Sequence, residues 1–363
     1  MQKKLIALAV ASLVSGAAFA QVAPNNVTLS GIIDMGYQYS WASTVAGTPA
    51  QHAFNDGGQD GSRLKLDGTE DLGNGLKVGF HTDFRFSVDT QSAVTTDNQN
   101  LFLTGGFGTV TAGSFGTALD DINGYSEAGG MGWGNGVGDM FKSSGALKNA
   151  VKYNSPVFGG FDFMAGISTN NQKAGEVEKF TDAVPADLAG TPVVLGSPAT
   201  YNVRAYTARG SYVNGPVKAG LAVIKEKVQQ TDASRTEWLL SGSYNFGPVI
   251  LGAGYARSSL TDDAVGTDFG AFKKRTAYRI NVGAPIGAND AVALSYLHAK
   301  QTYLLGAADQ SAKGFGLSYT HNLSKRTNLY ASYGQVNQDD GVAVTAVNGT
   351  YEKAFKVGLR HQF

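Results

Sequence analysis

Residues 76–88 read LKVGFHTDFRFSV. Six even positions of this stretch are apolar, namely Leu76, Val78, Phe80, Phe84, Phe86 and Val88. The positions between them carry Lys77, His81, Asp83, Arg85 and Ser87. This alternation predicts a β-strand with one apolar and one polar face. Full charges beside small residues on the polar face are typical of a strand that lines the water-filled lumen of a transmembrane barrel.

The same alternation recurs in segments 27–40, 161–167 and 355–363, where odd positions are mainly apolar and even positions mainly polar or small. Tyr and Phe gather near the ends of these segments, as aromatic girdles at two membrane interfaces require. Aromatic residues also favour strands in soluble sheets. The barrel prediction therefore rests on the repetition and on the charged face, not on any single strand.

The composition fits an all-β chain and excludes several other classes. Among 363 residues there are 48 Gly, 16 Tyr, 19 Phe and only 9 Pro, which favours strands and tight turns. The absence of cysteine excludes disulfides, cysteine zinc sites and thiol nucleophiles. A balance of 29 basic and 29 acidic residues argues against a general nucleic-acid partner. Beyond residue 20 there is no apolar run of about 18 residues, so helical membrane spans are excluded.

The first twenty residues predict export. Lys3 and Lys4 precede a short apolar stretch at 5–14, and Ala18-Phe19-Ala20 ends the segment as a cleavage site. This is the form of a secretory signal peptide over residues 1–20. Residues 21–363 are then predicted to be a single barrel in the envelope of a bacterium, with 27 basic and 29 acidic residues once the two leader lysines are removed.

The connections between the predicted strands fall into two classes that alternate along the chain. Seven are short and rich in turn residues: 70–75, 105–108, 155–160, 214–216, 246–248, 285–290 and 321–327. Eight are longer: 41–61, 89–97, 116–146, 169–200, 228–235, 260–273, 304–313 and 338–350. Fifteen connections predict a sixteen-stranded antiparallel barrel with short periplasmic turns and long extracellular loops. Such a barrel is wide enough for an aqueous channel.

Several stretches together resemble the general diffusion porins of Gram-negative bacteria, in particular the branch typical of β-proteobacteria. They are Val27–Gly31 with Asp34, Ser62–Leu64, Gly68–Lys77, Gly106–Thr111, Asn149–Phe158 and Val357–Phe363. The resemblance implies a homotrimer of sixteen-stranded barrels in the outer membrane, surrounded by lipid and lipopolysaccharide. It also implies a third loop folded into each pore, and a terminal Phe363 that helps the barrel-assembly machinery to recognise the chain.

The predicted third loop, 116–146, carries four carboxylates and one basic residue: Asp120, Asp121, Glu127, Asp139 and Lys142. A solvated surface loop would have this composition too, but its length of about 30 residues favours a functional inward loop. The facing wall is predicted to be basic, from Arg63, Lys65, Arg85, Lys148, Lys152, Arg209, Arg279 and Arg360. Those expected nearest to the constriction are Arg63, Arg85, Lys148 and Arg209. Opposed charges across a narrow aqueous gap would create a transverse field and set ion preference.

Two departures from the family pattern bear on this constriction. Members usually place Arg after Thr-Leu-Gly in the strand before the third loop, and here that position is Ser114. The family loop often reads Pro-Glu-Phe-Gly-Gly, and the comparable tract at 130–134 has no glutamate. We therefore expect the narrowest part of the pore to be wider or less charged than in typical members.

A few other groups of residues could form a catalytic or a calcium site. His81 and Asp83 could form a general-base pair, but Arg85 continues the row and favours pore lining. Residues 55–60 and the pair Asp339–Asp340 could bind calcium weakly, although solvated loop carboxylates fit them better. The sequence has no phosphate loop, H-E-x-x-H motif or nucleophile elbow, so we expect neither catalysis nor a cofactor.

The predicted function is a passive outer-membrane channel for ions and small hydrophilic solutes. Three alternatives stay open. A substrate-specific channel would show an aromatic row on one lumen wall, and lumen aromatics such as Phe102 are too few to assign one. A barrel enzyme would need a histidine with Ser or Asp partners at the rim. A secreted soluble β-protein such as an adhesin would bury Arg85 and Lys152 in a dry core, which is costly.

Overall fold

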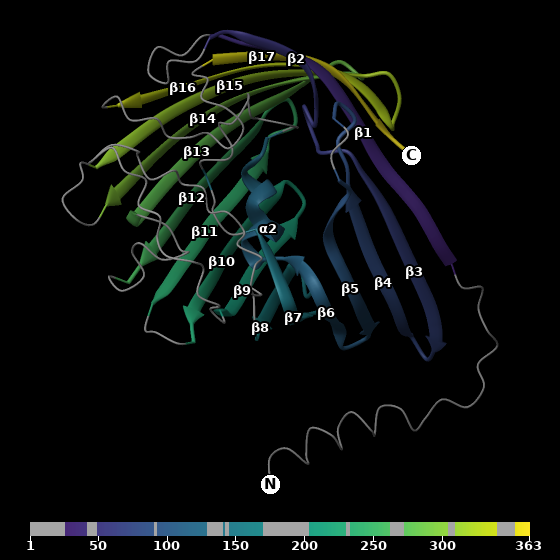
Figure 1. Cartoon of the computed structure of the whole chain (residues 1–363). Coiled ribbons are helices and arrows are strands. Elements are labelled where there is room, and N and C mark those ends of the chain that lie inside the picture. Colours follow the sequence, from purple (N-terminus) through teal and green to yellow (C-terminus); the bar gives the residue numbers. More distant parts are fainter. Residues whose placement is uncertain are drawn as a thin grey trace.

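The computed structural model describes residues 26–41, 49–90, 93–128, 141, 145–169, 203–229, 233–261, 272–303, 309–339 and 353–363. The predicted signal peptide and the loop residues Asp139, Lys142 and Asp340 lie outside the described residues. All described strands belong to one antiparallel sheet that closes on itself, because the first strand pairs with the last. Figure 1 shows this curved wall, with a short helix inside it.

The elements follow in chain order. The first strands are β1 Asn26–Ser40, β2 Gln51–Asp56, β3 Arg63–Gly73, β4 Leu76–Arg85, β5 Thr95–Gly105 and β6 Gly108–Gly116. Helix α2, Ala118–Asn123, and the 3₁₀ turn η1, Gly124–Ser126, come next. They precede β7 Ala146–Asn154, β8 Phe161–Ser168, β9 Val203–Asn214, β10 Val217–Val228, β11 Ser234–Asn245 and β12 Ile250–Leu260. The last strands are β13 Phe272–Ile286, β14 Asp290–Tyr303, β15 Gln310–Asn322, β16 Thr327–Asp339 and β17 Lys353–Gln362.

The barrel has sixteen strand positions, as predicted, because β2 and β3 share one of them. The C-terminal half of β1 pairs with β2, and its N-terminal half pairs with β3. Strands β2 and β3 are therefore two parts of one barrel strand, which is interrupted at residues 57–62. The prediction that 41–61 is an unbroken connection was wrong, since it contains β2. That strand escaped notice because Gln51–Asp56 holds one large apolar residue, Phe54.

The seven predicted tight turns are confirmed, and all join neighbouring strands of the sheet. The backbone of the turn between β3 and β4 explains why Gly and Asn occur there. Gly73, Asn74 and Gly75 have φ angles of +86°, +52° and +77°. Asn and Gly tolerate this left-handed region, which other residues rarely adopt.

The two faces of the sheet differ as the alternation predicts. In β4, Phe80 is 39% exposed while Asp83 is 2% exposed. Exposed large apolar side chains occur around the wall, from Val27 on β1 to Leu359 on β17. A continuous apolar outer band with a polar interior is the pattern of a barrel that faces lipid. Among the described residues, no helix is long and apolar enough to cross a membrane.

Helix α2 lies inside the barrel, against β9, β10 and β11. Leu119 and Ile122 are fully buried there. The wall is adapted to this contact by a glycine, because a Cβ on Gly220 would lie 2.7 Å from Cγ2 of Ile122. The described part of the third connection therefore folds inward, as the resemblance implied.

Candidate functional site

The inward loop is bound to the wall through Arg209 on β9. Its Nε donates to Oδ2 of Asp121 at 2.9 Å, and its Nη1 donates to Oδ2 of Asp162 on β8 at 2.5 Å. Nη1 also donates to Oγ of Ser211 at 2.7 Å. The guanidinium is only 11% exposed. The sequence predicted Asp121 and Arg209 on opposite sides of a gap, whereas the structure brings them into contact.

A second arginine of the wall, Arg279 on β13, holds the next turn of the loop. Its Nε donates to Oγ of Ser126 at 2.7 Å, and its Nη2 donates to the carbonyl oxygen of Asn123. Glu127 Oε1 lies 3.6 Å from Nη1 of Arg279. The guanidinium also lies over the ring of Phe141, 4.2 Å from its centroid. Glu127 therefore lies beside a wall cation, like Asp121.

Three other predicted site residues, two on the wall and one on the loop, lie near this contact. Nζ of Lys152 lies 4.6 Å from the ring centroid of Phe115, a cation–π contact. Asp120 forms a capping box with Thr117 at the start of α2, so one part of its role is to fix the helix end. Lys148 lies where the pairing of β6 and β7 shifts register, and its neighbour Leu147 has the fully buried side chain.

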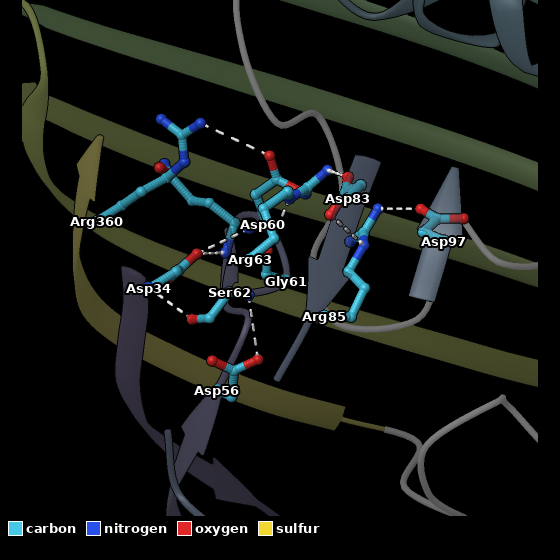
Figure 2. Close-up of polar contacts among 11 residues, drawn as sticks. Asp34, Asp56, Asp60, Gly61, Ser62, Arg63, Asp83, Arg85, Asp97 and Arg360 are labelled. Carbon is cyan, nitrogen blue, oxygen red and sulfur yellow. Dashed lines mark hydrogen bonds and ion pairs between the residues drawn. The ribbon is translucent and has the colours of Figure 1, made fainter. Parts of the chain in front are cut away.

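A cluster of three arginines and three aspartates occupies the wall formed by β3, β4, β5 and β17 (Figure 2). Nη2 of Arg85 donates to Oδ2 of Asp97 at 2.6 Å. Asp83 lies between two guanidinium groups, 3.8 Å from Nη1 of Arg63 and 3.8 Å from Nε of Arg85. Asp83 is 2% exposed, whereas Arg85 and Asp97 are about one third exposed. Arg85 and Asp97 thus face the lumen, whereas Asp83 is covered by its neighbours.

The third arginine, Arg360 on β17, reaches the same cluster from the other side. Its Nη2 lies 3.6 Å from Oδ2 of Asp60, and Oδ1 of Asp60 pairs with Nη2 of Arg63. Asp60 belongs to the interruption between β2 and β3, for which the sequence favoured solvated carboxylates. The structure instead places it between two wall arginines (Figure 2).

His81 pairs across the hairpin and not along its own strand. Its Nδ1 lies 2.6 Å from Oδ1 of Asp67, which is its ladder partner on β3. The pair of His81 with Asp83, weighed above as a general base, is therefore not the contact that forms. Lys65 is the ladder partner of Asp83. Among the residues that the structure describes, no three His, Asp or Glu side chains are arranged to hold a metal ion.

Sequence reasoning missed four carboxylates of these clusters: Asp60, Asp67, Asp97 and Asp162. Asp67 and Asp162 had a usable signal, because both lie on the inward parity of a predicted strand. Asp60 and Asp97 had none, since one was assigned to a loop and the other lies next to a bulge of β5.

Comparisons with known proteins agree with this architecture. Residues 7–341 match the family described as Gram-negative porin. The chain is 30% identical to outer membrane porin protein 32 of Delftia acidovorans, and 31% identical to an outer membrane porin protein of Bordetella pertussis. Both alignments cover 100% of each chain. Among solved structures, the anion-selective porin from Comamonas acidovorans matches with a TM-score of 0.70 and 26% identity, over 93% of this chain and 100% of that one.

The family match covers most of the chain, and the closed sixteen-strand barrel with an inward loop has the corresponding form. This family forms channels and has no enzymatic activity. The chain therefore belongs to the Gram-negative porin family and forms a channel in the outer membrane of a Gram-negative bacterium.

Proposed function

We propose that this channel passes ions and small hydrophilic solutes by passive diffusion through a water-filled lumen. Its selectivity comes from charges on the inward loop and on the barrel wall. The observation that carries the proposal is the position of α2 and η1 inside the barrel, against β9–β13, while the arginine–aspartate cluster lines another wall. The proposed pore-lining residues are Arg63, Lys65, His81, Asp83, Arg85, Asp120, Asp121, Glu127, Lys148, Lys152 and Arg209.

The charges of the loop and of the wall do not form two uncompensated rows. Asp121 is bound to Arg209, and Glu127 lies beside Arg279, so the loop side is locally balanced. Arg85 on the other wall is also paired, with Asp97, but its side chain is 34% exposed. We place the ion-discriminating field there, because a partly exposed charge in water still changes local ion concentration within a Debye length. One relative is described as anion-selective, and an arginine wall would support that preference here.

The subunit arrangement belongs to the same proposal. Outward side chains of β1 and β3–β6 are largely apolar, among them Leu29, Phe80 and Leu101. Outward basic residues at the loop ends of strands instead gather on β9, β10, β12–β15 and β17: Arg204, Lys225, Lys227, Arg257, Lys274, Lys300, Lys313 and Lys353. We propose that the apolar side meets the other subunits of a homotrimer and that the basic side faces outer-membrane lipid and lipopolysaccharide.

The register supports a lipid role for this basic rim. Lys227 and Arg204 are ladder partners on neighbouring strands. Neighbouring basic side chains near a membrane surface favour the anionic headgroups of lipids. The rings of Trp238 and Tyr255 pack together beneath these basic residues, with their centroids 5.2 Å apart, as aromatic residues do at a membrane interface. Lys300 pairs with Asp309 at 2.9 Å, and its hydrogen bond holds the pKa of Asp309 below the ordinary value.

Planar-bilayer reconstitution tests the channel. Stepwise conductance is expected, in groups of three for a trimer, and a purified, folded protein without conductance would refute the function. Under a KCl gradient, Arg63→Glu and Arg85→Glu should move the reversal potential toward cation preference. A unit charge about 7 Å from the ion path contributes roughly 0.6 kcal/mol in water, or about threefold in local ion concentration. Lys325→Glu, an exposed charge reversal in the turn between β15 and β16, is the matched control.

A further inference from the structure

The interruption between β2 and β3, residues 57–62, folds onto the inner wall of the barrel. Nε2 of Gln59 donates to Oγ1 of Thr320 on β15 at 3.1 Å. Gly58 lies against the hydroxyl of Tyr330 on β16, where a Cβ would overlap the phenol oxygen. Tyr330 is 4% exposed and is on the inward parity of its strand. The segment therefore crosses the inner faces of several strands that lie far from it in sequence.

Asp34 on β1 anchors this segment. Its Oδ2 accepts hydrogen bonds from the backbone N–H groups of Gln59 at 2.6 Å and Asp60 at 2.7 Å. Its Oδ1 accepts the hydroxyl of Tyr330 at 2.7 Å, and its own N–H donates to Oγ of Ser62 at 3.0 Å. Asp34 is fully buried, so the carboxylate is used entirely to hold the segment. Charged acceptors with several donors form strong, specific contacts.

The segment delivers one charge to the lumen. The side chain of Asp60 is 36% exposed and bridges Arg63 and Arg360, as Figure 2 shows. Arg63 is also fixed by its segment, because its Nε donates to the carbonyl oxygen of Gly61 at 3.0 Å. The folded segment thus adds a carboxylate beside Arg63 and fixes the position of this arginine, one of the four residues predicted nearest to the constriction.

We propose that residues 57–62 form a second inward element of the pore, with Asp60 as a specificity-determining residue and Asp34 as the positioning residue that holds it. This inference rests on the proposed channel function. Asp60 offsets the positive charge of Arg63 and Arg360, and so moderates the attraction of this wall for anions. The third loop and the 57–62 segment then act from different parts of the wall.

Neutralising the carboxylate tests the charge. Asp60→Asn removes one negative charge beside two guanidinium groups, so the chloride-to-potassium permeability ratio should rise by about threefold. The control is Glu70→Gln, which makes the same change at an exposed position near the turn end of β3. A ratio that stays at the wild-type value in Asp60→Asn overturns the role of Asp60.

Cysteine labelling tests the position independently. The chain has no cysteine, so Asp60→Cys creates a single thiol. Modification with a sulfonate-bearing methanethiosulfonate restores a negative charge, and a trimethylammonium-bearing one adds a positive charge. Both should reduce the conductance step, and they should move the reversal potential in opposite directions. If neither reagent changes current although mass spectrometry shows labelling, the segment does not line the pore.

The anchoring role predicts a different set of effects. Asp34→Ala removes the acceptor for two backbone N–H groups, so open-channel noise should rise and the Asp60→Asn shift should largely disappear in the double variant. Asp34→Asn retains one acceptor oxygen and should restore quiet current in part. Should Asp34→Ala not assemble, Tyr330→Phe removes only one of the bonds and provides the same test. Full Asp60→Asn shifts in both Asp34→Ala and Tyr330→Phe would overturn the positioning role.

These outcomes separate the two proposals. A wild-type protein that forms no conducting pore refutes the channel function itself. A conducting wild type whose current ignores Asp60→Asn and both thiol reagents leaves the channel intact and refutes only the inward element.

Discussion

Oδ2 of Asp121 lies 2.9 Å from Nε of Arg209, so the inward loop is latched to the barrel wall by an ion pair. Asp162 completes the latch from β8. A charge used in this way is held in place and compensated, and contributes less to the field in the lumen than a free carboxylate would. The first role of Asp121 is therefore mechanical, and the field depends more on residues outside the loop.

Breaking the latch should loosen the loop. Asp121→Ala removes a hydrogen bond to a charged group, which contributes about 1.5–3 kcal/mol. The buried Leu119 and Ile122 keep α2 inside the barrel, so we expect a folded channel with noisier and larger current steps. Single-channel recording checks this, and Glu70→Ala is the control. In a double-mutant cycle, purely additive effects of Asp121→Ala and Arg209→Gln would contradict the latch.

A glycine on the wall permits the loop to dock. A Cβ on Gly252 would overlap the backbone carbonyl of Ser126 in η1, and backbone yields less readily than a side-chain end. Gly252→Val should therefore displace η1 from β12 and raise the conductance. Gly210→Val on β9 is the matched control, because nothing lies within 4 Å of where its Cβ would stand. Equal conductance in the two variants would contradict the docking role of Gly252.

The barrel itself was predictable because the lipid face forces a strict alternation on every strand. Segment 76–88 showed both the strand and its charged inner face, and the turn residues fixed the number of strands. This logic failed at Gln51–Asp56, where the strand lies near the loop end and needs little apolar surface. Alternation is also a weaker guide where a bulge shifts the register, as beside Lys148.

The clusters were only partly predictable, because alternation identifies which side chains face inward but not how they pair. Arg63 and Arg85 were predicted in the inward row, but their partners Asp60 and Asp97 come from irregular backbone. The position of Asp60 depends on Asp34, which is distant in sequence and needs the closed barrel to reach it. The sequence placed Asp34 on the polar face of segment 27–40 and in a family motif, but it indicated no partner for the carboxylate.

The basic rim predicts a preference for phosphorylated lipid. Reversing Arg204 and Lys225 to Glu should weaken binding of purified lipopolysaccharide, by about fivefold for each charge removed at a membrane surface. The effect should shrink as salt increases. Co-purification and quantitative binding in detergent measure it, with Lys325→Glu as the control. Unaltered binding in the double variant would exclude this rim as the lipid site.

The terminal residue offers the last prediction, because it sits at the closing seam. Phe363 and Gly31 exchange backbone hydrogen bonds at 3.0 and 3.2 Å, and a Cβ on Gly31 would overlap the ring of Phe363. Two roles are therefore separable. Phe363→Ala should lower trimer yield in cells if the ring is the assembly signal, whereas Gly31→Val keeps the signal and displaces the ring from its packing site, with a second contact to the backbone carbonyl of Arg63.

Heat-modifiability on gels and refolding in detergent distinguish these roles. A recognition role predicts that Phe363→Ala assembles poorly in cells yet refolds nearly normally when purified. A packing role predicts that Phe363→Ala and Gly31→Val lose stability together in detergent. Phe246→Ala, at an exposed aromatic residue in the turn between β11 and β12, controls for general loss of interfacial aromatics. Wild-type yield of Phe363→Ala in cells would refute the assembly role, because the seam's backbone bonds would then suffice to close the barrel.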